Sequence, residues 1–187
     1  MRPIRQSVVE IRPLFQERQC TELVDWAERQ GLPPWAGGAE STALSRRVVD
    51  ELLRAGLWPC LAEAIRLALC REPVRFAGPA FIDRFDAGQR LLPAAGSGIE
   101  IECPHEETEE PFGICGRCRE TTVVVMAFLN DAFAGGEFVY HLYDGPVTVE
   151  PAAGAALVFP AFLTCEDAPV REGCKYVLRV AVKVAEL

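Results

Sequence analysis

The last third of the chain constrains its fold most, because it consists of short β-rich runs separated by turn residues. The runs lie at residues 119–131, 149–159 and 165–180, and Gly, Pro and Asp punctuate the sequence between them. Short strands with frequent turn signals are typical of an antiparallel sandwich or barrel. Residues 176–184 alternate, with Arg179 and Lys183 on the face opposite a continuous apolar stripe. We therefore expect a last strand with one buried and one partly wet side.

Helices are expected to precede these strands, within residues 15–70. Apolar residues recur there at spacings of three and four, which is the period of a helix with one buried face. The expected buried positions in three helices are Cys20, Leu23, Val24 and Ala27; Val48, Val49, Leu52 and Leu53; and Leu61, Ala64, Ile65 and Ala68. Two strands are then expected at 74–76 and 81–85, with Gly78 and Pro79 as a turn between them. Helices followed by strands indicate an α+β fold in which helices cover a mainly antiparallel sheet.

The bulk composition fits one globular domain, residues 1–187, with a substantial core. A net charge of −8 argues against nucleic acid and anionic membrane surfaces as partners. The start of the chain lacks the apolar core of a signal peptide, and no run approaches the length of a membrane span. We therefore expect a cytoplasmic protein whose eight cysteines serve as thiols or metal ligands rather than as disulfides.

A candidate metal site lies in an insert at about residues 99–119. Cys103 and His105 form one pair of ligands, Cys115 and Cys118 form another, and nine residues separate the pairs. Three thiolates and one imidazole make the closed tetrahedral set of a structural zinc, with no open position for catalysis. The intervening loop is too polar to build its own core, so a metal would supply the missing folding free energy. The alternative is that the two pairs are unrelated surface residues.

Six further segments stand in a distinctive order along the chain. They are a helix at 16–24, Arg-Phe-Asp-Ala-Gly-Gln at 84–89, the apolar run 124–130, Gly-Gly-Glu-Phe at 135–138, the segment 151–159, and Pro-Val-Arg-Glu-Gly-Cys-Lys-Tyr at 169–176. Together they resemble the prolyl-4-hydroxylase branch of the 2-oxoglutarate/Fe(II) dioxygenases, over about residues 8–184. Val124 and Phe128 stand where the family motif has Thr and Tyr. The resemblance implies a double-stranded β-helix, or jelly roll, with N-terminal helices packed on one sheet.

The resemblance also implies a metal centre, and here the sequence departs from the family. Family members hold Fe(II) with a His-x-Asp pair and a distal His, and 2-oxoglutarate chelates the iron. The corresponding positions in this chain are Ala94, Gly96 and Cys165. Of these residues, only the thiol can bind a metal. With two histidines in the chain, one of them assigned to zinc, the normal triad cannot be built. Lys175 matches the basic residue that pairs with the 2-oxoglutarate carboxylate, although a solvated lysine at a strand end would equally explain it.

We therefore predict a jelly-roll pseudoenzyme, stiffened by structural zinc, that binds a protein or peptide partner or a small carboxylate near Lys175. We do not expect Fe(II) or 2-oxoglutarate to bind as they do in the family. One alternative is an active 2-oxoglutarate/Fe(II)-dependent, prolyl-hydroxylase-like enzyme with a centre built from His105, Glu107 and Cys165. Another is an ordinary jelly-roll binding protein whose likeness is architectural. His141 lies on the strand parity opposite to Phe138, so we expect it to point out of the barrel.

Overall fold

The structure is a computed structural model that describes residues 8–32, 48, 50–53, 56–95 and 120–185. Its labelled helices are α1 (Glu17–Arg29) and α3 (Trp58–Leu69). Its strands are β1 (Val9–Ile11), β2 (Pro73–Asp86), β3 (Ala94–Ala95), β4 (Glu120–Phe128), β5 (Phe133–Gly135), β6 (Phe138–Leu142), β7 (Gly145–Val149), β8 (Ala156–Pro160), β9 (Thr164–Asp167) and β10 (Val170–Ala185). Residues 48 and 50–53 are also helical.

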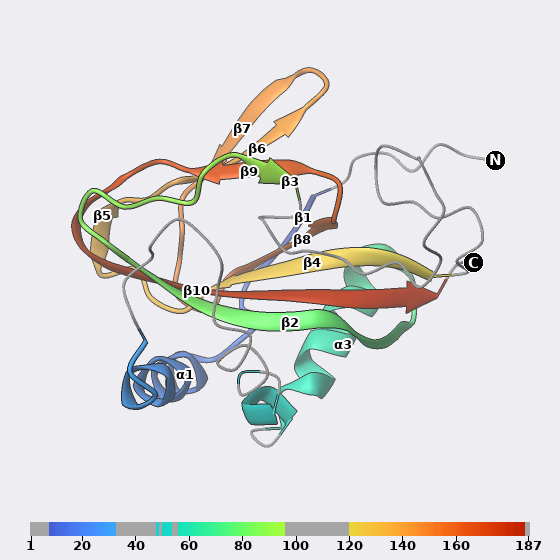
Figure 1. Ribbon diagram of the computed structural model, residues 1–187. Coiled ribbons are helices and arrows are strands. Elements are labelled where there is room, and N and C mark those ends of the chain that lie inside the picture. Colours follow the sequence, from blue (N-terminus) through green and yellow to red (C-terminus); the bar gives the residue numbers. More distant parts are fainter. Residues whose placement is uncertain (1–7, 33–47, 49, 54–55, 96–119, 186–187) are drawn as a thin grey trace.

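The described strands form two sheets. The major sheet has the order β1-β8-β4-β10-β2, with β5 paired to the start of β10, and the minor sheet has the order β3-β9-β6-β7. The strand pairs of both sheets are antiparallel, from β1–β8 through to β6–β9. Figure 1 shows the minor sheet above the major sheet, with the helices below it. This arrangement is a jelly roll, as the sequence predicted.

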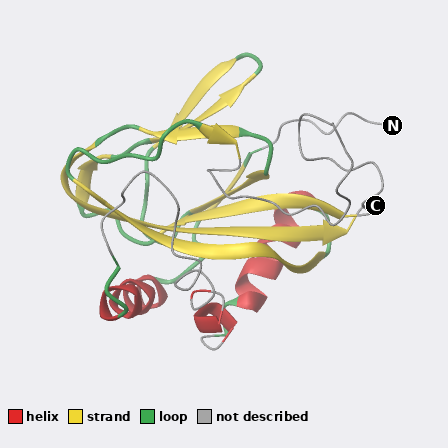
Figure 2. Ribbon diagram, in the orientation of Figure 1, coloured by secondary structure: helices red, strands yellow, loops and turns green. Residues whose placement is uncertain are grey.

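The helices cover the outer face of the major sheet (Figure 2). In α1 the buried residues are Cys20, Leu23 and Ala27, as the helical spacing predicts, and in α3 they are Leu61, Ala64 and Ile65. Gln16 caps the N-terminus of α1, and its backbone N–H donates to the Gln19 side chain at 2.8 Å. These helices and alternate residues of β2, β4, β8 and β10 form one apolar cluster.

Three sequence predictions need correction. Leu53 is 51% exposed, because it lies about 100° around the helix from the buried Leu52. Gly78 and Pro79 do not form a turn, since β2 runs through them as one strand. The pairing with β10 shifts between Phe76 and Ala80, so a β-bulge absorbs the Gly-Pro pair. An edge strand tolerates proline, and β2 lies at the end of the sheet order.

The third correction concerns β10, which has no wet side among its central residues. Arg179 and Lys183 are 1% and 6% exposed, because their face of the strand is turned toward the interior between the two sheets. β10 pairs with β4 on one side and β2 on the other, so it is central rather than peripheral.

Among the helices of the described segments, none is long and apolar enough to cross a bilayer.

Candidate functional site

The space between the two sheets is filled mainly by aromatic and aliphatic side chains. Phe138 of β6 lies between the two sheets, with its ring centroid 5.9 Å from that of Phe159 and 6.4 Å from that of Phe128. All three rings are fully buried. They belong to a second apolar cluster, which is separate from the one under the helices. Any polar group in this interior therefore needs a partner supplied by the chain itself.

Two of the three predicted iron-ligand positions lie side by side in the minor sheet. Ala94 of β3 is the direct cross-strand partner of Cys165 of β9. Cys165 is fully buried, and its thiol donates to the carbonyl oxygen of Leu163 at 3.4 Å. Gly96, the third position, lies outside the described residues. A methyl group has no lone pair, so the described part of this set offers one donor atom, a thiol.

Lys175 is completely buried, and it contacts β9 two residues beyond Cys165, at Asp167. Its Nζ is 2.8 Å from Asp167 Oδ1 and donates to the carbonyl oxygen of Gly136, also at 2.8 Å. The rings of Phe85 and Phe128 flank the ammonium, with centroids 5.8 Å and 5.6 Å away. Burial lowers the pKa of Lys175 and raises the pKa of Asp167, while each charge opposes the shift of the other. Lys175 is therefore part of an internal ion pair and is not a solvated strand-end lysine.

The local sequence explains how this pair forms. Strand alternation places Asp167 on the same inward face of β9 as Cys165, and the short link at 168–169 leads directly into β10. Gly136, with φ of +66°, leaves room for the lysine, because a Cβ at this position would meet Lys175 Cδ at 3.1 Å. Sequence reasoning missed Asp167. The alternation of Cys165 and Asp167 on one strand face was the available signal.

A second buried ion pair lies further along β10. Arg179 Nη2 donates to Asp83 Oδ1 of β2 at 3.1 Å, and Nε contacts the other carboxylate oxygen. The Phe81 ring lies beneath the guanidinium, with its centroid 5.1 Å from Cζ. The two contacts make this a bidentate pair, which is the geometry that best repays the cost of burying both charges. Sequence reasoning missed this pair as well.

His141 points away from the interior, as its strand parity predicted. Its Nε2 lies 3.0 Å from Glu166 Oε1, and its side chain is 40% exposed. Among the described residues, no three His, Cys, Asp or Glu side chains are grouped so as to hold a metal ion. The predicted zinc ligands Cys103, His105, Cys115 and Cys118 lie outside the described residues, as does Glu107. Of the residues that the structure describes, those around Ala94 therefore do not fit a facial iron site.

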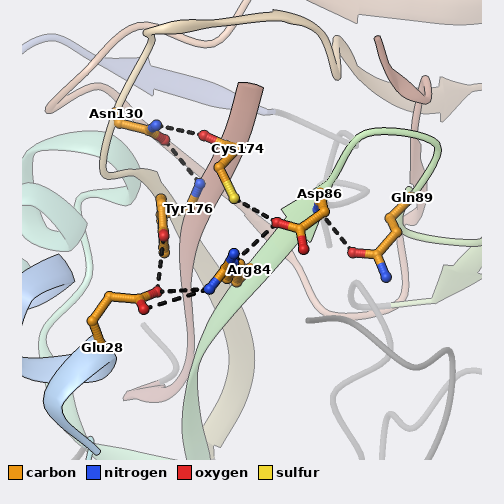
Figure 3. A network of polar contacts seen from close by, with 7 residues as sticks. All are labelled: Glu28, Arg84, Asp86, Gln89, Asn130, Cys174 and Tyr176. Atoms are coloured by element: carbon orange, nitrogen blue, oxygen red, sulfur yellow. Dashed lines mark hydrogen bonds and ion pairs between the residues drawn. The ribbon is translucent and has the colours of Figure 1, made fainter. Parts of the chain in front are cut away.

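A polar network joins α1 to the ends of β2 and β10 (Figure 3). The Cys174 thiol donates to Asp86 Oδ1 at 2.6 Å, and Arg84 Nε donates to the same oxygen at 3.0 Å. Tyr176 Oη donates to Glu28 of α1 at 2.8 Å, and Arg84 Nη1 lies 3.4 Å from the Glu28 carboxylate. The hydrogen bond from Cys174 lowers the pKa of Asp86, and partial burial raises the pKa of the thiol. This network connects helix α1 to strands β2 and β10 of the major sheet.

Asn130 and Gln89 complete the network by binding backbone groups. Asn130 Nδ2 donates to the carbonyl oxygen of Cys174 at 2.7 Å, and its Oδ1 accepts the N–H of Tyr176 at 2.8 Å. Gln89 Oε1 accepts the N–H of Asp86 at 2.8 Å. Asn130 therefore fixes the backbone at Cys174, and Gln89 fixes the backbone at Asp86, which accepts the hydrogen bond of the Cys174 thiol.

Comparison with solved structures shows what this fold resembles. A Pseudomonas putida prolyl-4-hydroxylase matches with a TM-score of 0.59 and 17% identity, over 97% of this chain and 94% of that one. A viral collagen prolyl hydroxylase from Paramecium Bursaria Chlorella virus-1, solved with 2-oxoglutarate, matches with a TM-score of 0.60 and 14% identity, over 94% and 95%. HygX from Streptomyces hygroscopicus, solved with nickel and 2-oxoglutarate, matches with a TM-score of 0.63 and 14% identity, over 95% and 81%.

These neighbours are prolyl-4-hydroxylases and other 2-oxoglutarate/Fe(II) oxygenases, and this chain has their fold. No family model matches the sequence, and no curated protein matches it. The predicted resemblance is thus confirmed at the level of fold. Fold alone does not determine activity, which depends on the residues of the site.

Proposed function

We propose that this protein is a 2-oxoglutarate/Fe(II) oxygenase-fold pseudoenzyme that serves as a binding or regulatory module. The observation that carries the proposal is the pairing of Ala94 with Cys165 across β3 and β9. The resemblance assigns both residues to iron-ligand positions, and together they offer a single sulfur. A non-haem Fe(II) site of this class needs two imidazoles and a carboxylate on one face of the metal.

The surroundings of Lys175 support the same proposal. In the dioxygenases that this sequence resembles, the basic residue at the matching position pairs with the carboxylate of 2-oxoglutarate. Here Asp167 lies 2.8 Å from the Lys175 ammonium instead. A second carboxylate at Lys175 would leave one of two buried anions without a counter-charge, which costs several kcal/mol, on the order of 3–5. We therefore propose a protein or peptide as the partner, in preference to a small carboxylate.

The β6–β7 hairpin supports a protein partner. Figure 1 shows it projecting from the minor sheet. β9 pairs with β6 through Phe138, Val139 and Tyr140, so the end of the hairpin extends past that strand. Tyr143 at the turn is fully exposed. Tyrosine combines an apolar ring with a hydroxyl, and it is enriched where proteins meet.

We further propose that zinc stabilises the insert at residues 99–119, through Cys103, His105, Cys115 and Cys118. The support is the ligand spacing in the sequence. The proposal includes a cytoplasmic, reducing location, which would keep these cysteines as thiols. Cys115→Ser is expected to lose bound zinc and to lower the melting temperature. Cys70→Ser changes an exposed thiol outside the insert and serves as the control. Unchanged zinc content in Cys115→Ser would contradict the four-ligand assignment.

The decisive experiment for the function is metal and turnover analysis. The purified protein is analysed for zinc and iron, incubated anaerobically with Fe(II), and then assayed for succinate formed from 2-oxoglutarate. We expect one zinc per chain, no iron uptake and no succinate. Iron-dependent succinate release that disappears in Cys165→Ala, but not in the buried-thiol control Cys20→Ala, would instead support an active hydroxylase with a centre of His105, Glu107 and Cys165.

A further inference from the structure

The Lys175 site has the composition of a carboxylate receptor. Its ammonium has three neutral contacts, the Gly136 carbonyl at 2.8 Å and the rings of Phe85 and Phe128, and one charged contact, Asp167. Neutral oxygens and aromatic faces attract a cation but do not cancel its charge. The Asp167 carboxylate is therefore the contact that neutralises the charge of the Lys175 ammonium.

The carboxylate reaches this receptor from the opposite sheet. Asp167 belongs to β9 of the minor sheet, while Lys175 lies on β10, which continues into the major sheet. Asp167 is 2% exposed, and its backbone N–H donates to the carbonyl oxygen of Leu91 at 3.0 Å, which fixes the position of the strand. The backbone around the receptor is thus held independently of the Asp167 side chain.

We propose that Asp167 is a tethered ligand, so that the receptor at Lys175 is a carboxylate-binding site which the chain occupies by itself. Shortening Asp167 to alanine then leaves a buried ammonium facing a space of about the size of the carboxyl group removed. A small free carboxylate such as formate or acetate fits that space and restores the lost charge balance. This inference rests on the proposed function, since a bound co-substrate would otherwise compete for the same ammonium.

The test is chemical rescue of the Asp167→Ala variant. Thermal unfolding is measured for the wild type, for Asp167→Ala and for the double variant Asp167→Ala/Lys175→Met. Each is titrated with sodium formate, sodium acetate and 2-oxoglutarate, against sodium chloride at matched ionic strength. We expect a saturable rise in the melting temperature of several degrees for Asp167→Ala with formate or acetate. The wild type and the double variant should show no saturable response.

Every outcome of this titration decides the question. If Asp167→Ala is unfolded in chloride, refolding yield becomes the readout, and yield must increase with carboxylate. A folded or refolding variant that does not respond to carboxylate overturns the inference. So does saturable carboxylate binding to the wild type that Lys175→Met abolishes, because the receptor would then be open. Iron-dependent succinate release by the wild type would overturn the proposed function, and it would overturn this inference as well if Lys175→Met abolished that release.

Discussion

The two faces of the major sheet are built on different principles. The face under the helices is a continuous apolar cluster that includes Leu178, Val180 and Val182 of β10. The face toward the minor sheet holds four of the five buried charged side chains of the described residues, which are Asp83, Lys175, Arg179 and Lys183. The fifth, Asp167, reaches this face from β9 of the minor sheet. One face is an apolar packing surface. The other carries charged side chains, most of which form buried ion pairs with one another. The comparison shows that β10 can be apolar on one face and carry buried ion pairs on the other.

The largest effect should come from breaking the Lys175–Asp167 pair. Lys175→Met leaves the Asp167 carboxylate buried without its cation, and we expect a loss of roughly 3–5 kcal/mol in the free energy of unfolding. The double variant Lys175→Met/Asp167→Leu removes both charges and should return to wild-type stability or exceed it. Urea unfolding of both variants measures this. A double variant as unstable as the single one would show that the two charges do not form a unit.

A smaller effect is expected on the helix-covered face of the same strand. Leu178→Ala leaves a cavity in a fully buried apolar position, at a cost of about 3 kcal/mol. Because no charge is involved, the loss should be the same at low and high salt in urea unfolding. A strong salt dependence would mean that the two faces are not separate, as the comparison requires.

The network that joins α1 to the sheet should have a smaller effect that depends on pH. The folded-state pKa of Asp86 lies below its usual value of 3.8, so this carboxylate adds stability above that pH and loses it as the pH falls through the folded pKa. Asp86→Asn is expected to cost about 1 kcal/mol at pH 7. Its difference from the wild type should vanish below the folded pKa.

Stability measured between pH 2 and 7 tests this expectation. Asp144→Asn, in the exposed turn of the hairpin, is the matched control. If the free energy of unfolding falls in the same way with decreasing pH in the wild type and in Asp86→Asn, the lowered pKa of Asp86 is contradicted.

The smallest effect concerns two adjacent leucines on the helix at 50–53. Leu53→Ala should change the free energy of unfolding by less than about 0.5 kcal/mol, because the side chain is half exposed. Leu52→Ala, in the buried position beside it, should cost about 3 kcal/mol. Equal costs in thermal or urea unfolding would restore the original prediction that both leucines are buried.

The sequence predicted the elements whose periodicity is strong and whose environment is simple. The buried stripe of α1 and the existence of strand β10 follow from spacing alone, because apolar burial selects one period in each case. The Gly78–Pro79 pair was misjudged because turn residues also occur at bulges, and sequence does not distinguish the two. The polar residues of β10 were misjudged because burial of Arg179 depends on Asp83, which is 96 positions away in sequence.

The candidate site was predictable in part, for the same reason. The absence of ligand chemistry at Ala94 is visible in the sequence, and its pairing with Cys165 is now given by the strand register. The ion pair of Lys175 with Asp167 needed the structure, because a buried lysine and a solvated one look the same in a sequence. Strand alternation from Cys165 to Asp167 places the aspartate inward, but it does not identify the cation that it meets.

The bulge in β2 has a consequence for how copies of this protein behave at high concentration. β2 is an edge strand of 14 residues in the order of the major sheet. The backbone groups of an edge strand of that length can pair with a strand from another molecule. The proline at 79 cannot donate a hydrogen bond to an incoming strand, and the distorted segment between Phe76 and Ala80 breaks the regular spacing that such a strand would need. The opposite border, β1, is three residues long. Both edge strands, β1 and β2, thus disfavour edge-to-edge pairing with strands of other molecules.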